Sequence, residues 1–228
     1  SKYTFITVRV DENGKFYDLK QGSLGGMSTS TPAIYDGRAY IGISGTGQFQ
    51  SFTGSGIMVL DIATAQPIYA MKTRGYPQSS GLVSTAYLDV PHYNPQTGQE
   101  ETGFVYVYFT ENINPGNVSY IIDKPGITEP VLFDNVGGIE TAPLLFIPKG
   151  GHAQYNLSSL QVDKYGTMYM KTDSAFIMAI GHKIEEIELR EEPDKTVYYP
   201  GDVFDPTGIK VVLKYCNGLE RDVSDYVK

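Results

Sequence analysis

Short runs of alternating apolar and polar residues follow one another along most of the chain, separated by turns that contain glycine. Residues 3–10 alternate in this way, a polar turn ending at Gly14 follows, and residues 15–19 alternate again. Side chains on a β-strand point to opposite faces at every second residue, so this period predicts antiparallel hairpins. Residues 32–43 repeat the arrangement around Asp36-Gly37, a common hairpin turn. No run has helical periodicity, so the pattern predicts an all-β protein.

A longer pattern occurs twice, with a third and looser copy. Each copy has small polar residues, a short apolar strand, a turn with glycine and a second apolar strand. The two clear copies begin at Ser30 and Leu157, and the looser one begins at Gln78 and resumes at Thr102 after an insertion. Repetition at this scale is typical of propellers, solenoids and arrays. Two further strands after the first copy complete a four-stranded unit, the size of a propeller blade.

The repeats predict about three such units within residues 1–183. Residues 104–109 are apolar enough to predict a strand that is buried on both faces, as when blades stack face to face. Tyr40 and Tyr169 are expected at equivalent positions of their units, with Tyr106 as a weaker third case. The second unit, its insertion, a long connection and the third unit are predicted at about 79–135, 89–103, 136–152 and 155–181.

The charge balance changes near His182 and indicates a second domain. Residues 184–228 contain six Lys and Arg against eleven Asp and Glu, a net charge of -5, which leaves twelve against fifteen and -3 for residues 1–183. Residues 184–190 alternate as a new strand, and Asn217-Gly218 is a strong hairpin turn. The pattern predicts a small all-β domain over 184–228, following a repeat region over 1–183.

Two runs carry a resemblance to a known repeat family. Residues Ser30–Gly42 read as a serine-proline strand, a turn and a tyrosine strand, and Gly56–Thr64 add an apolar strand that ends in aspartate. On these runs, residues 1–183 resemble the pyrroloquinoline-quinone-like β-propeller repeats. Propellers of that family have more blades than this region can supply, so the resemblance implies about half a propeller.

A second resemblance covers the end of the chain. The run Pro193–Gly218, with its Tyr-Tyr-Pro-Gly-Asp segment and the later Ile-Lys-Val-Val-Leu strand, is similar to bacterial immunoglobulin-like domains of the group-three type. That family continues with further strands, so the resemblance implies a truncated β-sandwich. Proteins with this module are typically secreted or displayed on bacterial cell walls, and the resemblance therefore implies an extracellular or cell-surface location.

The composition argues against several classes of binding partner. The net charge of -8 and the isoelectric point of about 4.9 argue against nucleic acid and anionic membranes, which attract clustered Lys and Arg. No apolar run is long enough to span a membrane, so membrane insertion is not expected. Cys216 is the single cysteine, which excludes an internal disulfide and a cysteine-based metal site.

The sequence offers no clear catalytic or metal constellation. The three histidines, His92, His152 and His182, are scattered among loops and at the domain junction, without the spacing of a triad or a transition-metal site. Residues 11–14 have part of a calcium-loop pattern, but a hairpin turn explains them better. The acidic residues between 185 and 192 suggest either a carboxylate pair or the solvated face of a strand. No catalytic, cofactor or metal residue is therefore assigned.

The candidate contact residues are tyrosines in loops: Tyr76, Tyr87 and Tyr93. Loop aromatics stack on sugar rings or anchor protein partners, although tyrosine also fills propeller cores. We expect a non-catalytic, secreted or cell-surface binding module that contacts a protein or carbohydrate, with the immunoglobulin-like segment as a spacer.

The alternatives are an enzyme on the propeller, either a quinone-dependent oxidoreductase or a carbohydrate-active enzyme, and a purely structural repeat protein. The absence of Trp disfavours the quinone enzyme. Open blade faces also predict self-association or association with missing blades.

Overall fold

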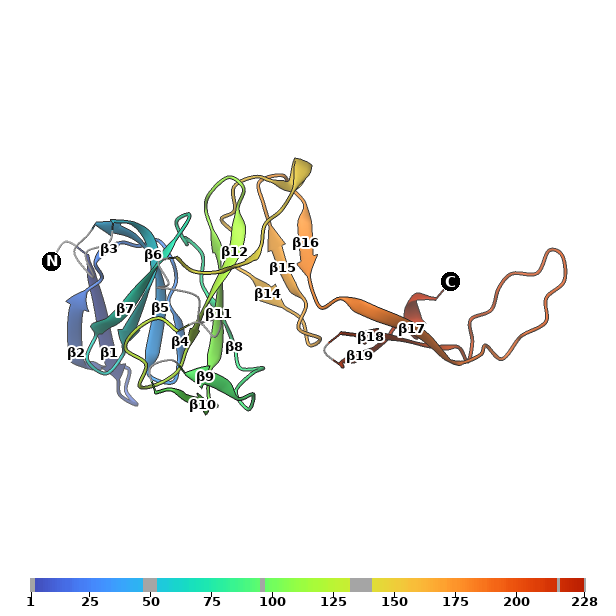
Figure 1. Ribbon diagram of the computed structural model, residues 1–228, viewed down its shortest axis with the longest axis horizontal. Coiled ribbons are helices and arrows are strands. Elements are labelled where there is room, and N and C mark those ends of the chain that lie inside the picture. The colour runs from blue at the N-terminus through green and yellow to red at the C-terminus, as the bar shows by residue number, and fades with distance from the viewer. Residues whose placement is uncertain (1–2, 47–52, 95–96, 132–140, 217, 228) are drawn as a thin grey trace. The chain divides into compact units, whose positions relative to one another are not determined.

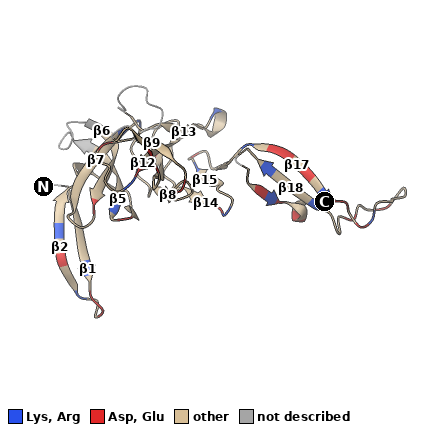
Figure 2. Ribbon diagram, turned by 60° about the horizontal axis from the view of Figure 1, so that its bottom comes forward, with Lys and Arg blue, Asp and Glu red and all other residues tan. Residues whose placement is uncertain are grey.

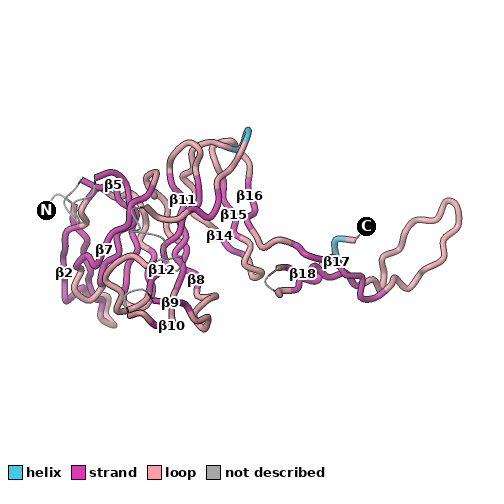
Figure 3. The backbone as a smooth tube through the Cα atoms, viewed as in Figure 1, coloured by secondary structure: helices cyan, strands magenta, loops and turns pink. Residues whose placement is uncertain are grey.

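The computed structural model describes residues 3–46, 53–94, 97–131, 141–216 and 218–227. Figure 3 shows a chain of strands joined by loops and turns. The helical elements in these ranges are two short 3-10 turns, η1 (Gly150–His152) and η2 (Ser224–Tyr226). The all-β class predicted from the alternating pattern is therefore confirmed.

The chain forms two compact units. The first comprises residues 1–161 and 170–178, and the second comprises residues 162–169 and 179–228. The second unit thus includes a turn that belongs to the last repeat as well as the acidic C-terminal segment. The boundary after residue 183 stays a prediction.

The first unit contains an N-terminal hairpin and two larger antiparallel sheets. The two larger sheets, called the first and second sheets here, lie side by side (Figure 1). The N-terminal hairpin pairs β1 (Thr4–Val10) with β2 (Phe16–Ser23). The first sheet has the order β3-β5-β6-β7, and β4 also pairs with β5. Its strands are β3 (Gly26–Met27), β4 (Ala33–Tyr35), β5 (Arg38–Thr46), β6 (Thr53–Asp61) and β7 (Gln66–Thr73).

The second sheet repeats this up-and-down arrangement in the order β13-β12-β11-β8. Its strands are β8 (Leu82–Ser84), β11 (Val105–Glu111), β12 (Asn117–Asp123) and β13 (Leu144–Phe146). The predicted connection over 136–152 is wrong in part, because β13 lies inside it and pairs with β12. The strand is short and follows several prolines and glycines, which hid its pattern. The predicted insertion contains a hairpin of its own, β9 (His92–Asn94) with β10 (Gln99–Glu101).

Two three-stranded sheets complete the fold. The third sheet has the order β14-β15-β16, with β14 (Gln161–Val162), β15 (Met168–Lys171) and β16 (Ile177–Ile180). The C-terminal sheet has the order β17-β18-β19, with β17 (Ile184–Glu191), β18 (Lys210–Tyr215) and β19 (Glu220–Asp222). The predicted turn Asn217-Gly218 lies between β18 and β19 in the sequence, and Asn217 lies outside the described residues. Gly218 donates its amide hydrogen bond to the carbonyl of Tyr215 at 2.9 Å.

Local side chains explain the first two turns. Asp36 and Gly37 have φ angles of 43° and 76°, the left-handed conformation that a two-residue hairpin turn requires. In the N-terminal hairpin, Asp11 Oδ1 accepts hydrogen bonds from the amides of Asn13 and Lys15, each at 2.9 Å. The carboxylate therefore stabilises the turn itself, as the hairpin interpretation of residues 11–14 predicts.

A serine contacts the second strand in each repeat, through a backbone amide in the two clear copies and through a threonine hydroxyl in the looser one. Ser30 Oγ accepts from the amide of Gly42 at 3.0 Å, and Ser158 Oγ accepts from the amide of Lys171 at 3.0 Å. In the second copy, Ser79 Oγ lies 2.7 Å from Thr110 Oγ1. Each partner follows a tyrosine by two residues, so the contacts make Tyr40, Tyr108 and Tyr169 equivalent. The equivalent tyrosine in the second copy is thus Tyr108. The expected residue, Tyr106, lies two positions earlier on β11, so that expectation is wrong.

Two apolar layers cover the faces of the first sheet. One face packs on the second sheet, with Tyr40, Tyr69 and Met71 against Val107 and Phe109. The other face carries its own buried cluster, against which residues of the N-terminal hairpin pack. The prediction for 104–109 holds in part: Phe104, Val105, Val107 and Phe109 are buried, whereas Tyr106 and Tyr108 are half-buried.

Glycine lets the backbone approach closely where the chain leaves the first sheet. A Cβ atom built on Gly42 would lie 1.7 Å from the carbonyl oxygen of Pro77. A carbonyl oxygen in a packed connection cannot move aside as a flexible side chain does. The Ile41-Gly42-Ile43 segment therefore needs glycine for steric reasons, beyond any turn geometry.

Replacing Gly42 with alanine is expected to lower the free energy of unfolding by at least about 2 kcal/mol, because the added methyl group forces backbone movement. Urea unfolding followed by circular dichroism measures this change. Gly151→Ala is the control, since a Cβ there meets nothing within 4 Å. Equal stability of the two variants would show that the close approach at Pro77 is not a constraint.

Candidate functional site

The structure places the three candidate tyrosines in different environments. The Tyr76 hydroxyl accepts a hydrogen bond from the amide of Thr29 at 2.6 Å, so this side chain fastens a connection beside the first sheet. Tyr87 is half-buried, and its ring centroid lies 4.9 Å from that of Tyr106. Tyr93 lies on β9 and is 43% exposed. The three residues therefore do not form one site, although Tyr87 belongs to a larger aromatic group.

That group is a set of tyrosines on one face of the second sheet. Tyr106 and Tyr108 point to the same side of β11 because they are two residues apart, and Tyr120 is directly opposite Tyr108 on β12. The ring centroids of Tyr106 and Tyr120 are 5.7 Å apart, and those of Tyr108 and Tyr120 are 6.1 Å apart. With Tyr87, these half-buried side chains make up what we call the tyrosine face.

The hydroxyl of Tyr108 on the tyrosine face is neutral. Burial raises the pKa of Tyr108 above its ordinary value, and the neighbouring Tyr87, Tyr106 and Tyr120 add to the rise. The phenol therefore stays protonated across the physiological range. A half-buried phenol combines an apolar ring with a hydroxyl that donates and accepts hydrogen bonds.

The insertion carries further rings to the edge of this face. The ring centroid of His92 lies 6.1 Å from that of Tyr106 and 6.0 Å from that of Phe104, with edge-on geometry in both pairs. Burial lowers the pKa of His92, so the imidazole is neutral at pH 7. Tyr93 is the next residue on β9 and therefore points away from His92.

Ion pairing fixes the insertion to the second sheet. Lys124 Nζ lies 2.5 Å from Glu101 Oε2 and 4.9 Å from the centroid of the Phe104 ring. Thr97 Oγ1 donates to the other oxygen of Glu101 at 2.5 Å. The hydrogen bonds from Lys124, Thr97 and Asn94 lower the pKa of Glu101 to about 2. The carboxylate stays ionised, so its ion pair with Lys124 ties β10 of the insertion to the residue that follows β12.

A buried polar cluster joins the first and second sheets. Asp123 at the end of β12 accepts hydrogen bonds from Arg38 Nη1 at 2.8 Å, Tyr40 Oη at 2.8 Å and Tyr69 Oη at 2.9 Å. Arg38 also donates through Nη2 to the carbonyl of Ile127 at 2.7 Å. The Asp123 side chain is fully buried. We call these four side chains the Asp123 cluster.

The Asp123 cluster has the residue types of an active site, but substrate cannot reach its buried carboxylate. Burial raises the pKa of Asp123, and the charge of Arg38 and the hydrogen bonds from both tyrosines oppose that rise. Burial also raises the pKa of Tyr40 and Tyr69. Perturbed groups of this kind mark catalytic sites only where substrate can reach them. Here the carboxylate has no exposed surface and its oxygens are hydrogen-bonded, so the cluster fastens two sheets together.

A second buried carboxylate fastens another connection. Glu111 at the end of β11 accepts a hydrogen bond from the amide of Gly75 at 2.6 Å and another from the hydroxyl of Ser119. Glu111 is fully buried. It therefore ties the segment after β7 to the second sheet. No local signal in the sequence predicts this role, because Glu111 is a single acidic residue at the end of an apolar strand.

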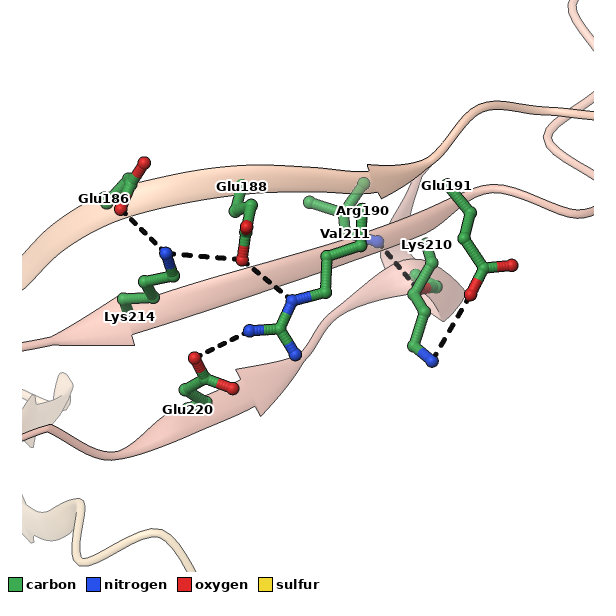
Figure 4. A network of polar contacts seen from close by, with 9 residues as sticks. Glu186, Glu188, Arg190, Glu191, Lys210, Val211, Lys214 and Glu220 are labelled. Atoms are coloured by element: carbon green, nitrogen blue, oxygen red, sulfur yellow. Dashed lines mark hydrogen bonds and ion pairs between the residues drawn. The ribbon is translucent and has the colours of Figure 1, made fainter.

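The acidic run of β17 forms an ion-pair network on one face of the C-terminal sheet (Figure 4). Lys214 Nζ lies 3.0 Å from Glu186 Oε2 and 3.4 Å from Glu188 Oε2. Arg190 contacts Glu188 at 2.8 Å and Glu220 at 2.7 Å. Figure 2 shows the charged segments along β17 and β18.

Glu188 is held in its ionised form. The hydrogen bond from Arg190 lowers the pKa of Glu188, and that from Lys214 adds to the effect. A general acid at neutral pH needs the opposite shift. The geometry thus fits the solvated strand face and not a catalytic carboxylate pair.

The remaining candidate groups are dispersed. Within the described ranges, no three His, Cys, Asp or Glu side chains are placed to hold a metal ion. Cys216 is an exposed free thiol. His152 makes an edge-on contact with Phe176 at 4.5 Å between centroids. No helix in the described part of the chain has the length and apolar character to cross a membrane.

The chain matches no family model and no curated protein sequence.

Replacing Asp123 with asparagine is expected to lower the free energy of unfolding by about 3–5 kcal/mol, because Arg38 is left as a buried charge without a counter-ion. Tyr69→Phe removes one neutral donor and should cost only about 1–2 kcal/mol. Thermal and urea unfolding of both variants measure the difference. Similar, small losses for both would show that the ion pair contributes little to the contact between the sheets.

Proposed function

We propose that this protein is a non-catalytic binding module, in which the insertion and the tyrosine face contact a carbohydrate or protein ligand. The observation that carries the proposal is the group of aromatic rings on the second sheet, beside an insertion that an ion pair ties to that sheet. Glu101 and Lys124 hold the segment in place, Tyr93 is exposed on it, and Tyr87 packs against Tyr106. Binding residues are often found on loops that a rigid scaffold positions.

The chemistry of these rings suits recognition. Tyrosine buries a large apolar area at a small cost in conformational entropy, and its hydroxyl hydrogen-bonds to sugar hydroxyls or peptide groups. A ligand that stacks on the tyrosine face would meet Tyr87 and Tyr106, whose rings already pack together in the free protein. Such preorganisation improves affinity, since less freedom is lost on binding.

We further propose a secreted or cell-surface setting, with residues 1–183 as part of a β-propeller and residues 184–228 as an immunoglobulin-like spacer. The up-and-down order of the first and second sheets supports the blade interpretation. The serine contact that recurs in the first and third sheets supports a common origin of those two units as repeats. The similarity of Pro193–Gly218 to bacterial immunoglobulin-like domains supports the spacer and the location.

The rival proposal is an enzyme on the same scaffold. A quinone-dependent oxidoreductase predicts a new absorbance band when pyrroloquinoline quinone is added to the pure protein. A carbohydrate-active enzyme predicts shortened products from the glycans that bind. Retention of glycan without either signal supports the binding module.

The binding proposal predicts that Tyr93→Ala and Tyr87→Ala each weaken ligand retention by about tenfold or more, as loss of an aromatic anchor does. Screening on a glycan array and against extracellular matrix proteins finds the ligand, and titration of the variants measures the loss. Tyr199→Ala is the matched control, because Tyr199 is 73% exposed but lies outside the insertion. Equal loss in the control, or no ligand in either screen, would contradict the proposal.

A further inference from the structure

The third sheet is one strand short of the first and second sheets. The serine contacts make β5, β11 and β15 equivalent strands, and the next strand along the chain pairs with each of them: β6, β12 and β16. A fourth strand then pairs with β6 and with β12, namely β7 and β13. The strand that follows β16 is β17, which pairs with β18 in the C-terminal sheet instead. Within the described ranges, β16 is therefore an edge strand where its two equivalents are central strands.

The sequence of β16 repeats that of the central strand β6. Residues 57–60 of β6 read Ile-Met-Val-Leu, and residues 177–180, which make up β16, read Ile-Met-Ala-Ile. Each of the residues 57–60 is 3% exposed or less, whereas Ile177 is 75% exposed and Met178 is half-buried. The same kind of apolar strand is thus buried where a fourth strand is present and open where that strand is missing.

The strand β16 also lacks the residues that commonly keep an edge strand from pairing. Edge strands are often protected by charged side chains and by proline, which cannot donate a main-chain hydrogen bond. The last strand of the first sheet, β7, contains both Pro67 and Lys72. No charged residue and no proline is present in β16. Its outer row of amide and carbonyl groups is therefore a template for a further strand.

The first and second sheets show which kind of strand occupies the equivalent position. In the first sheet, β7 is antiparallel to β6 and places Met71, Ala70 and Tyr69 opposite residues 57, 58 and 59 respectively. In the second sheet, β13 is antiparallel to β12 and has the apolar sequence Leu-Leu-Phe. Both fourth strands are extended and uncharged where they lie beside the apolar part of their neighbour.

From this comparison we infer that the outer edge of β16 binds an extended apolar segment of a partner protein, which adds to the third sheet as its fourth, antiparallel strand. In strand addition of this kind, main-chain hydrogen bonds supply affinity and alternate side chains supply specificity. The match between β16 and β6 predicts a small partner residue opposite Met178, as Ala70 is opposite Met58. This edge lies on a different sheet from the ligand surface proposed above, and the inference does not depend on that proposal.

The test is a titration of the full chain against a fluorescent peptide with the sequence of β7, Gln66–Thr73, followed by anisotropy. Binding should be saturable, and Ile177→Lys should weaken it by at least about tenfold, because the variant places a charge in the new apolar contact. Val162→Lys is the matched control, since Val162 is 49% exposed on β14 at the opposite edge of the same sheet. Absence of saturable binding at millimolar peptide, or equal loss in the two variants, would overturn the inference.

A second peptide separates strand addition from general hydrophobic contact. The same peptide with N-methyl groups on residues 68–71 keeps its side chains but cannot donate main-chain hydrogen bonds there, so it should bind at least about tenfold more weakly. Equal affinity of the two peptides would refute main-chain pairing.

Sedimentation velocity of the full chain without peptide tests whether a second copy occupies the edge instead. Ile177→Lys should leave the association state of the chain unchanged, because the inferred occupant is a different protein. A wild-type dimer that Ile177→Lys dissociates, and that Val162→Lys does not, would show that β16 pairs with another copy and would contradict the inference. Circular dichroism confirms that each variant keeps its β-sheet content.

Discussion

The contact between the first and second sheets depends on one buried carboxylate. Asp123 accepts from Arg38 and from two tyrosine hydroxyls at the same interface where the apolar side chains of both sheets meet. A buried charge is tolerated only with a paired charge and satisfied hydrogen bonds. The position of β12 relative to β5 and β7 is therefore fixed more narrowly than apolar packing would fix it, since hydrophobic contact is not directional.

That fixed contact supports the candidate binding surface. Asp123 on β12 points toward the first sheet and Tyr120 points toward the opposite side. The two residues are three positions apart, and side chains an odd number of positions apart on a strand lie on opposite faces. Lys124, the next residue, pairs with Glu101 and holds the insertion. One short stretch of chain therefore connects the interior of the first unit with the tyrosine face and with the loop beside it.

The sequence alone determined the all-β class, the hairpin at Asp36-Gly37 and the insertion, since alternation and turn residues are local signals. It also marked Ser30 and Ser158, whose equivalent hydrogen bonds the fold displays. The tertiary structure decided the rest. Asp123 and Arg38 are 85 residues apart in the chain, and nothing local in the sequence announces their contact. The tyrosine face depends in the same way on strand register, which places Tyr120 opposite Tyr108 and leaves Tyr76 and Tyr93 outside the group.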